Sequence, residues 1–592
     1  MSIDLENNLK LLFKKMKSLN LDAFLIPRID MFSGEEVPLE EERLKFISNF
    51  TGSAGIAIIS ANPNFKSAIF SDGRYQLQMK NEVDLKYYDL FNGGFKEVAN
   101  TLIKKKHILK KIGIDPWLIT LDQFSYLKDV SYNLNFLENN LIDEVWLDRP
   151  IETQNKIFEL NTKYTGEDRD SKIERLKSTI LENKYDFYIL FNPMSLCWLL
   201  NIRAMDLKHT PVLRAFCLVS KFGEVFVFSK NKSLKKYLNT SKKIHLYDFE
   251  DLSGFLEKHS NYKILFDPKV LPLKIYNLIN KNKIEYKKIQ CPVDSFKTIK
   301  NSNELSGFKN AHLKDGLSIL KLFYWIEKNV SSKKLTEISI AEKLLEIRSL
   351  DPSFICESFS TISAFRDNGA IIHYKASKLS NKKINKSGLY LIDTGAHYLD
   401  GTTDVTRTLL VGKADPEMIN DYTLVLKGHI AIATAVFPKK TKGRDLDILA
   451  RIALWSEGKD YSHGTGHGVG FVLSVHEGPI SISKLSRIII EPGMIISNEP
   501  GYYKNGHYGI RIENLEHVLL KKINDLNESF LCFENITRVP LEKKLIDKSK
   551  LTKFEIDWIN CYHQKVLCDL SKLIDKENLE LIEFLKIKTS EI

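Results

Sequence analysis

Cysteine is scarce in this chain of 592 residues: there are seven, and none forms a CxxC pair. This usage excludes a small disulfide-stapled domain and predicts reduced thiols in a cytoplasmic protein. Long apolar runs are also missing, because runs such as 430–437 fall far short of the roughly 20 residues that cross a bilayer. No basic flank precedes an apolar run at the N-terminus, so we expect neither a signal peptide nor a membrane partner.

A dense patch of one charge is the third absence. Lys and Arg number 86 against 75 Asp and Glu, but the net charge of +11 is spread along the chain. A scattered excess is typical of a solvated surface, so we expect no nucleic-acid partner. With 43% hydrophobic and 27% charged residues, the composition is that of an ordinary globular protein with several domains.

The first 300 residues repeat one order of elements. A helix predicted at 9–19 precedes strands at 22–27 and 54–60, and later a helix at 172–182 precedes strands at 186–191 and 214–220. Alternating strands and helices predict two α/β domains of similar build, 1–150 and 151–300. Pro150 and its polar neighbours mark the join.

A different pattern begins near residue 302. Long amphipathic helices are predicted at 304–330 and 336–348, and strands, glycines and histidines follow residue 358. The pattern is helical again after 541. We therefore predict a domain at 301–540 and a helical extension at 541–592 that packs on it.

Two acids flank a predicted hairpin in 389–408. Asp393 ends one apolar strand and Asp404 begins the next, with a turn around 398–401. If the hairpin is centred at 398–399, the two acids are directly opposed, with Cβ atoms about 4.5–5.5 Å apart. Two such carboxylates repel each other unless a cation lies between them.

A second pair of acids repeats this arrangement. Glu499 and Glu513 are symmetric about Asn505-Gly506, and Asn-Gly is the strongest short hairpin signal. For each acid alone, a solvent-facing carboxylate on an amphipathic strand is the favoured interpretation. The same arrangement found twice favours one shared site with four carboxylates.

Histidines and glycines alternate in 463–470, the sequence HGTGHGVG. Glycine lets the backbone approach a site closely. A phosphate loop is the rival interpretation, but the GK[ST] signature and its strand–loop–helix setting are missing. His463 and His467 therefore indicate a metal site or a proton relay. His476 and His373 complete the set, although a histidine in an apolar stretch such as 371–373 is more often structural.

Four carboxylates and one imidazole suit two divalent ions. An oxygen-rich donor set favours Mn²⁺, with Co²⁺ or Zn²⁺ as alternatives. A dinuclear site lowers the pKa of a bridging water and supplies hydroxide near neutral pH. Histidines that do not bind metal could stabilise the tetrahedral intermediate and pass protons. This is the chemistry of amide hydrolysis.

These residues resemble a known family. The order Asp393, Asp404, His467, Glu499, Glu513 is similar to the metal-ligand series of the pita-bread metallopeptidases, which include methionine aminopeptidase, prolidase, aminopeptidase P and the non-metal creatinase. The likeness is strongest to the cytosolic, three-domain Xaa-Pro aminopeptidases. It covers essentially the whole chain, in the segments 72–75, 198–203, 368–374, 398–408, 463–470, 498–503, 509–515 and 558–563.

The resemblance implies a fold and a set of roles. Two creatinase-like α/β domains would precede a pita-bread catalytic domain and its helical extension. Asp404 and Glu513 would bridge two metals, Asp393 would bind one of them, and His467 and Glu499 would bind the other. The residues that would bind substrate or move protons are His373, His463, His476 and, from the N-terminal domain, Arg74. The implied enzyme is a homodimer, typically with Mn²⁺, that releases the first residue from peptides with proline in second position.

Two other functions fit parts of this pattern. Prolidase shares the chemistry but cleaves Xaa-Pro dipeptides and usually carries one N-terminal domain, whereas two are predicted here. A non-catalytic binding protein of the same fold would lose metal ligands, and all five candidates are present.

Overall fold

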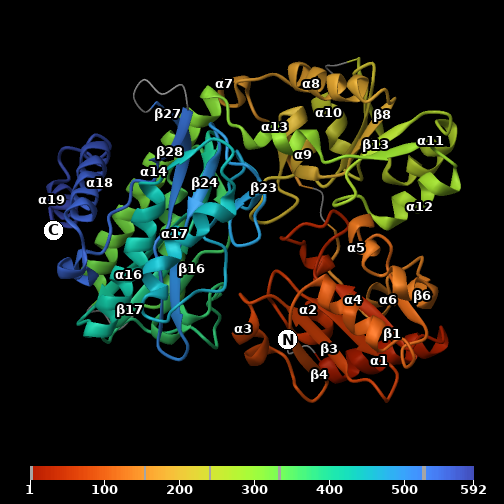
Figure 1. The fold of residues 1–592 in the computed structure, drawn as a ribbon, viewed down its shortest axis with the longest axis horizontal. Helices are drawn as coiled ribbons and strands as arrows, with labels where there is room; N and C mark the ends of the chain where they lie inside the picture. The colour runs from red at the N-terminus through yellow and green to blue at the C-terminus, as the bar shows by residue number, and fades with distance from the viewer. Residues whose placement is uncertain (1–3, 153–154, 239–241, 331–334, 523–528) are drawn as a thin grey trace. The chain divides into compact units, whose positions relative to one another are not determined.

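The computed structural model describes residues 4–152, 155–238, 242–330, 335–522 and 529–592. Contacts divide the chain into two units, which are shown in Figure 1. Unit 1 comprises residues 1–159 and 167–293, and unit 2 comprises 160–166 and 294–592. Within the described ranges, no helix is both long enough and apolar enough to cross a membrane.

Unit 1 contains two six-stranded mixed sheets of identical topology. In each sheet the first strand pairs antiparallel with the second and parallel with the fifth, while the third and fourth run parallel. The repeat predicted from the order of elements is therefore confirmed. The first sheet has the order β4 (Tyr88–Asn92), β3 (Ser67–Ser71), β2 (Ile56–Ser60), β1 (Ala23–Pro27), β5 (Ile112–Ile114), β6 (Leu134–Phe136). The second has the order β12 (Ile244–Tyr247), β11 (Val225–Phe228), β10 (Phe216–Ser220), β8 (Phe187–Leu190), β13 (Ile264–Phe266), β14 (Tyr286–Lys288).

Amphipathic helices cover these sheets. Helix α1 (Leu5–Ser18) buries Leu9, Leu12 and Met16, which recur at the helical spacing, and the Asp4 side chain caps its first turn. Phe32 and Phe191, from the two halves, pack with ring centroids 5.2 Å apart, so the two sheets share one core. The other helices are α2 (Arg43–Ser48), α3 (Gln76–Glu82), α4 (Phe95–Lys104), α5 (Leu121–Ser125), α6 (Leu141–Val145), α8 (Arg169–Glu182), α9 (Pro193–Leu200), α10 (Lys235–Leu238), α11 (Leu252–Lys258) and α12 (Leu273–Lys281); a short pair, β7 (Ile157–Glu159) and β9 (Ile202–Ala204), completes the unit.

Unit 2 places helices around antiparallel sheets (Figure 1). A six-stranded sheet has the order β21 (Val436–Pro438), β28 (Ser529–Asn535), β27 (Asn514–Lys522), β24 (Ile495–Asn498), β22 (Gly466–Gly468), β23 (Glu477–Ile482). Smaller sheets are β16 (Ile362–Phe365), β17 (Gly388–Thr394), β20 (Val405–Val411); β15 (Phe354–Glu357), β18 (Ala396–Tyr398), β19 (Gly401–Thr402); and β25 (Gly501–Lys504), β26 (Tyr508–Arg511). The helices are α7 (Thr162–Thr165), α13 (Pro292–Thr298), α14 (Ser302–Asn329), α15 (Glu337–Arg348), α16 (Pro416–Ala433) and α17 (Gly443–Trp455).

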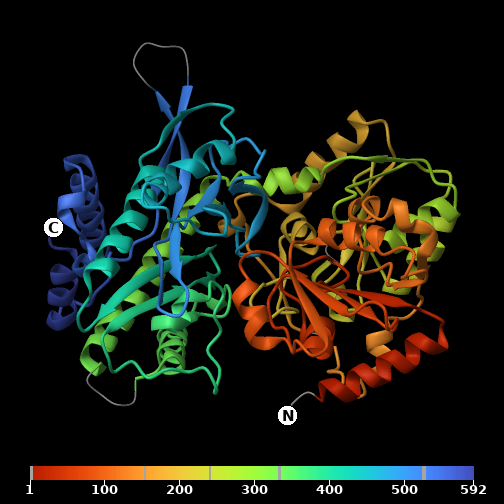
Figure 2. The same cartoon turned by 60° about the horizontal axis from the view of Figure 1, so that its bottom comes forward.

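The C-terminal extension packs on unit 2, as predicted. Helices α18 (Lys553–Ser571) and α19 (Leu579–Thr589) lie side by side in Figures 1 and 2. Ile559, Val566 and Leu585 belong to the main apolar core of unit 2, together with residues of α14 and α16. The extension is therefore part of that core.

Candidate metal centre

The register of the first hairpin differs from the prediction by two residues. Asp393 in β17 is opposite Thr406 in β20, and not opposite Asp404. The turn pairs Tyr398 with Gly401, so the hairpin is centred at 399–400. A shift of two keeps each residue on its face of the sheet, because side chains alternate with a period of two. Asp404 therefore remains on the face of Asp393, as a diagonal neighbour.

The second hairpin has the predicted register. Asn498 is opposite Asn514 in the β24–β27 pair, and Gly501 is opposite Arg511 in the β25–β26 pair. Both pairings are symmetric about Gly506. Glu499 and Glu513 lie between these two ladders, each next to one of the paired asparagines.

Glycines bring the His-Gly loop against these strands. A Cβ atom at Gly466 would lie 1.9 Å from the Ser497 carbonyl oxygen, so only glycine permits this approach of β22 to β24. The backbone N–H of His467 donates to Ser497 Oγ at 2.9 Å. The His467 Nδ1 atom lies 2.9 Å from the Gly468 carbonyl and can only donate to it, which leaves Nε2 as an acceptor.

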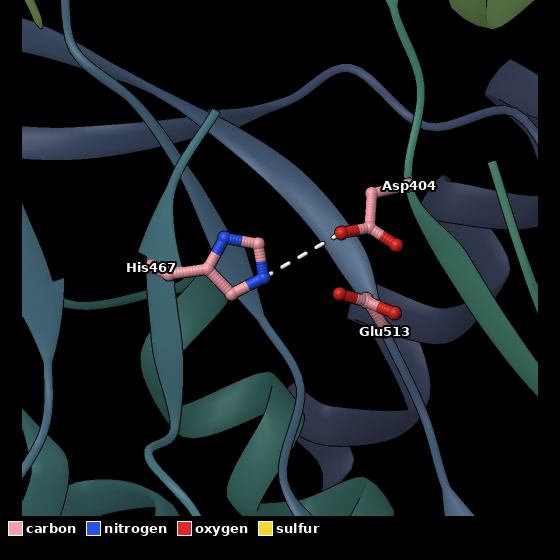
Figure 3. Close-up of side chains that lie close together, drawn as sticks. All are labelled: Asp404, His467 and Glu513. Carbon is pink, nitrogen blue, oxygen red and sulfur yellow. Dashed lines mark ion pairs between the residues drawn. The ribbon is translucent and has the colours of Figure 1, made fainter. Parts of the chain in front are cut away.

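Three side chains far apart in the sequence meet at this point (Figure 3). Asp404, His467 and Glu513 each offer one ligand atom, and these atoms lie within 4.8 Å of one another. His467 Nε2 is 3.5 Å from Asp404 Oδ2 and 3.3 Å from Glu499 Oε1. The imidazole nitrogen thus faces carboxylates from both hairpins.

The carboxylates of this centre are buried and repel one another. Asp404 is 3% exposed and Glu513 is 1% exposed. Burial, and then the negative charges of neighbouring acids, raise the pKa of Asp404 and that of Glu513 well above their usual values. Burial likewise raises the pKa of Glu499 to about 7. A bound cation would remove this penalty.

Asp393 joins the centre through Arg511. The Arg511 guanidinium donates to Asp393 Oδ2 and, through Nε, to Thr406 Oγ1 at 3.1 Å. Thr406 Oγ1 in turn donates to Glu513 Oε2 at 2.7 Å. Asp393 Oδ1 is buried and has no hydrogen-bond partner in the described part of the chain. This orphaned oxygen, within a carboxylate cluster that has one guanidinium, fits a site for divalent cations.

A chain of hydrogen bonds links His463 to the centre, and each bond in it is donated in the direction away from Arg511. Arg511 donates to the Tyr503 hydroxyl at 2.7 Å, and this hydroxyl lies 2.9 Å from His463 Nε2. His463 Nδ1 is 2.7 Å from the Gly464 carbonyl and donates to it. Burial raises the pKa of Tyr503 to about 12, so the phenol keeps its proton and donates it to His463.

His476 and His373 occupy different surroundings. The His476 ring lies edge-on to His467, with centroids 4.3 Å apart. His373 follows a 3-10 turn (Arg366–Ala370) and lies outside the group formed by Asp404, His467 and Glu513. Its loop is held by Glu337, whose carboxylate accepts from Asn368 Nδ2 and from the Tyr374 hydroxyl, each at 2.9 Å.

Arg74 belongs to unit 1, whereas the residues described above belong to unit 2. It lies in the predicted turn after β3, where the Tyr75 N–H donates to the Asp72 carbonyl at 3.1 Å. Its Nε and NH2 groups donate to the Asp72 carboxylate at 2.9 and 2.8 Å, and NH1 is 3.6 Å from Glu35. Asp72 therefore fixes the direction of the guanidinium.

Sequence reasoning missed the residues that connect the ligands. Tyr503, Thr406 and Arg511 were not among the candidates, although all three lie within segments of family resemblance. A signal was present for Arg511, since it precedes Glu513 by two residues and so shares its face. Thr406 follows Asp404 by two residues and likewise shares its face.

The comparisons with known proteins cover the whole chain. Family models match as metallopeptidase family M24 at residues 306–519, the C-terminal region of peptidase M24 at 529–592, and creatinase/prolidase N-terminal domains at 9–140 and 148–304. The chain therefore belongs to metallopeptidase family M24, with two creatinase-like α/β domains, a pita-bread catalytic domain and a helical C-terminal extension.

Relatives that match along nearly their full length are named Xaa-Pro aminopeptidases. A protein of Coprinopsis cinerea named "Probable Xaa-Pro aminopeptidase P" is 37% identical, across 100% of this chain and 99% of its own. The "Xaa-Pro aminopeptidase 1" of Dictyostelium discoideum is 36% identical over 95% of this chain and 92% of its own. The crystal structure of X-prolyl aminopeptidase from Caenorhabditis elegans, described as a cytosolic enzyme with a di-nuclear active site, is 31% identical and covers 99% of this chain and 100% of its own, with a TM-score of 0.92.

We predict that the metal content depends on the carboxylates. Asp404→Asn and Glu513→Gln each remove one negative charge from the cluster, so each should lose at least one of two bound divalent ions and all measurable activity, with an intact fold. Metal analysis and circular dichroism of the purified variants check this.

The matched control is Glu516→Gln, at a glutamate three residues after Glu513. Burial raises the pKa of Glu516 to about 8, so near pH 7 its carboxyl is mostly neutral, like the amide that replaces it. This variant should keep both ions. Near wild-type turnover with two ions bound in Asp404→Asn or Glu513→Gln would contradict the assignment.

Proposed function

We propose that this chain is a metal-dependent aminopeptidase that releases the N-terminal residue from peptides with proline in second position. One observation carries the proposal: ligand atoms of Asp404, His467 and Glu513 lie within 4.8 Å of one another. The chain that brings them together matches a relative named as an Xaa-Pro aminopeptidase along its full length. A non-catalytic role would not require this convergence of a histidine and two buried carboxylates.

The residues that would hold two divalent ions are Asp393, Asp404, His467, Glu499 and Glu513. Asp404 and Glu513 would serve both ions, Asp393 one of them, and His467 with Glu499 the other. When bound, two such ions lower the pKa of water and supply the nucleophile for amide hydrolysis. The oxygen-rich donor set favours Mn²⁺.

Histidines around the carboxylates would handle substrate and protons. His463 receives a hydrogen bond from Tyr503 at Nε2, so a proton taken up there stays within reach of the Tyr503 hydroxyl. His476, which stands against His467, and His373, on the loop held by Glu337, would orient the peptide. When the peptide bond breaks, the nitrogen of proline needs one proton, and His463 with Tyr503 can deliver it.

The proposal includes the domain boundaries and the assembly. We assign the α/β domains to 1–150 and 151–300, the catalytic domain to 301–540 and the extension to 541–592. The enzyme would act as a homodimer in the cytoplasm. Sparse cysteines support that location, and the similar enzyme of Caenorhabditis elegans is described as cytosolic.

A panel of peptides tests the substrate class. With added Mn²⁺, a tripeptide with proline second should be cleaved to a free first residue and a Pro-Xaa dipeptide. The same tripeptide with alanine second should react far more slowly, as should the Xaa-Pro dipeptide. Preference for the dipeptide would make the chain a prolidase, and cleavage of neither peptide by the Mn²⁺-loaded protein would refute the proposal.

His463→Ala separates proton transfer from metal binding. The variant should keep both ions but lose about 10²–10⁴-fold in kcat if His463 moves the proton. The matched control is His507→Ala, because His507 is exposed in the turn of the β25–β26 hairpin. Loss of metal from His463→Ala would make His463 a ligand, and an unchanged kcat would exclude it from proton transfer.

Arg74→Ala tests whether the first domain contributes to substrate binding. Losing a charge-assisted contact to the peptide should lower kcat/KM by roughly tenfold to a hundredfold, about 1.5–3 kcal/mol, mainly through KM. Arg74→Lys should restore little, since an ammonium cannot make paired hydrogen bonds. Arg444→Ala, which removes an exposed arginine of unit 2, is the control. An unchanged kcat/KM in Arg74→Ala would exclude Arg74 from substrate binding.

A further inference from the structure

The C-terminal extension has no part in the chemistry proposed above, although its segment 558–563 is one of those that resemble the family. Helix α18 presents Ile559, Tyr562 and Val566 to the core of unit 2. Apolar packing alone would explain why these three side chains are buried. Two polar connections, however, lead from this helix toward the hairpin that carries Glu499 and Glu513.

The first connection passes through Arg407. This guanidinium, in β20, is 1% exposed. Its NH2 group donates to the Tyr562 hydroxyl at 2.8 Å and to Asn514 Oδ1 at 2.7 Å, and its NH1 group donates to the Glu513 carbonyl oxygen at 2.7 Å. A planar guanidinium holds its partners in a fixed geometry. Arg407 therefore sets the position of the Glu513 backbone relative to Tyr562.

The second connection passes through His429 of α16. The Trp558 ring stacks on Tyr562, with centroids 5.5 Å apart, and meets the His429 ring edge-on at 5.9 Å. His429 Nδ1 is 3.1 Å from the Asn498 carbonyl, and Asn514 Nδ2 donates to His429 Nε2 at 3.1 Å. The buried imidazole thus joins the two strands of the hairpin.

The two connections meet at Asn514. Asn498 and Asn514 face each other in the β24–β27 ladder, and each adjoins one glutamate of the metal centre. The amide of Asn514 is shared, since its oxygen accepts from Arg407 and its nitrogen donates to His429. Helix α18 therefore contacts both groups that fix the spacing of Glu499 and Glu513.

We propose that helix α18 is a positioning element for the metal centre, acting through Tyr562 and Arg407 and through Trp558 and His429. The inference rests on the proposed assignment of Glu499 and Glu513 as ligands. Partners that orient metal ligands commonly contribute 10- to 100-fold to metal affinity. A change in α18 should accordingly weaken metal binding without removing any ligand.

Tyr562→Phe in the full-length chain is the decisive variant. It deletes the hydroxyl that accepts from Arg407 and keeps the ring that packs in the core. Calorimetric titration of the metal-stripped protein with Mn²⁺ should show binding about 10- to 100-fold weaker than in the wild type for at least one ion. His429→Phe, which removes the two imidazole contacts with the asparagines, should weaken Mn²⁺ binding in the same way.

Tyr422→Phe is the matched control. Tyr422 is a buried tyrosine of α16 whose hydroxyl accepts from the Glu542 N–H at 3.1 Å rather than from Arg407. Both Tyr→Phe variants should lower stability to urea by a similar amount, measured without metal. Only Tyr562→Phe should weaken Mn²⁺ binding. Equal Mn²⁺ affinities in the two variants would overturn the inference, even if His429→Phe does not fold.

Saturating Mn²⁺ provides a second measurement. By mass action, an excess of metal should restore the kcat of Tyr562→Phe to that of the wild type, with an unchanged KM for the tripeptide. A kcat that stays low with the metal sites filled would overturn the inference. Failure of the ligand assignment is recognised separately, because the wild type itself would then bind fewer than two ions, or Glu513→Gln would keep both.

Discussion

Repulsion among buried carboxylates is the constraint on which the rest of this structure depends. Two unit charges 4 Å apart interact by about 4 kcal/mol at an effective dielectric constant of 20, and a whole domain is stable by only about 5–15 kcal/mol. Asp404 and Glu513 are almost wholly buried and cannot be ionised together with their neighbours at low cost. The carboxyl groups must either take up protons, as their raised pKa values indicate, or share cations.

The surrounding sheets hold these charges together. Arg511 and Thr406 connect the two hairpins, and glycine at 466 lets β22 lie against β24. His467 contributes a neutral nitrogen, fixed in one tautomer by the Gly468 carbonyl. The chain thus combines a concentration of negative charge with the packing that prevents it from relaxing.

Much of this arrangement could be predicted from the sequence, because it depends on local patterns. The Asn-Gly turn determines the register of the β25–β26 hairpin, and alternation in the strands places Glu499 and Glu513 together. The first hairpin has no such turn. The centre predicted from the sequence therefore differs from the observed centre by one position, and the predicted register differs by two residues. Gly395 lets the two strands approach closely there, since a Cβ atom at this position would lie 2.1 Å from the Thr403 carbonyl oxygen.

Long-range partners could not be predicted in this way. Arg407 touches residues more than 100 positions away, and no local pattern indicates that its neighbours are Glu513 and Tyr562. Arg74 marks a different limit, because local residues predict its turn, whereas its role in binding substrate follows only from the family resemblance. The periodicity of apolar residues shows which face of a helix or strand is buried. Which distant helix or strand packs against that face depends on the packing of the whole core.

The order of these contacts along the chain affects how the enzyme is made during translation. Chains fold progressively as they emerge from the ribosome, with N-terminal domains first. Arg407 and His429 lie near the middle of the catalytic domain, whereas their partners in α18 are synthesised only after residue 552. The hairpin of Glu499 and Glu513 therefore lacks its final support until most of the chain has been made. Nascent chains should capture metal weakly, and tight loading should coincide with the end of synthesis.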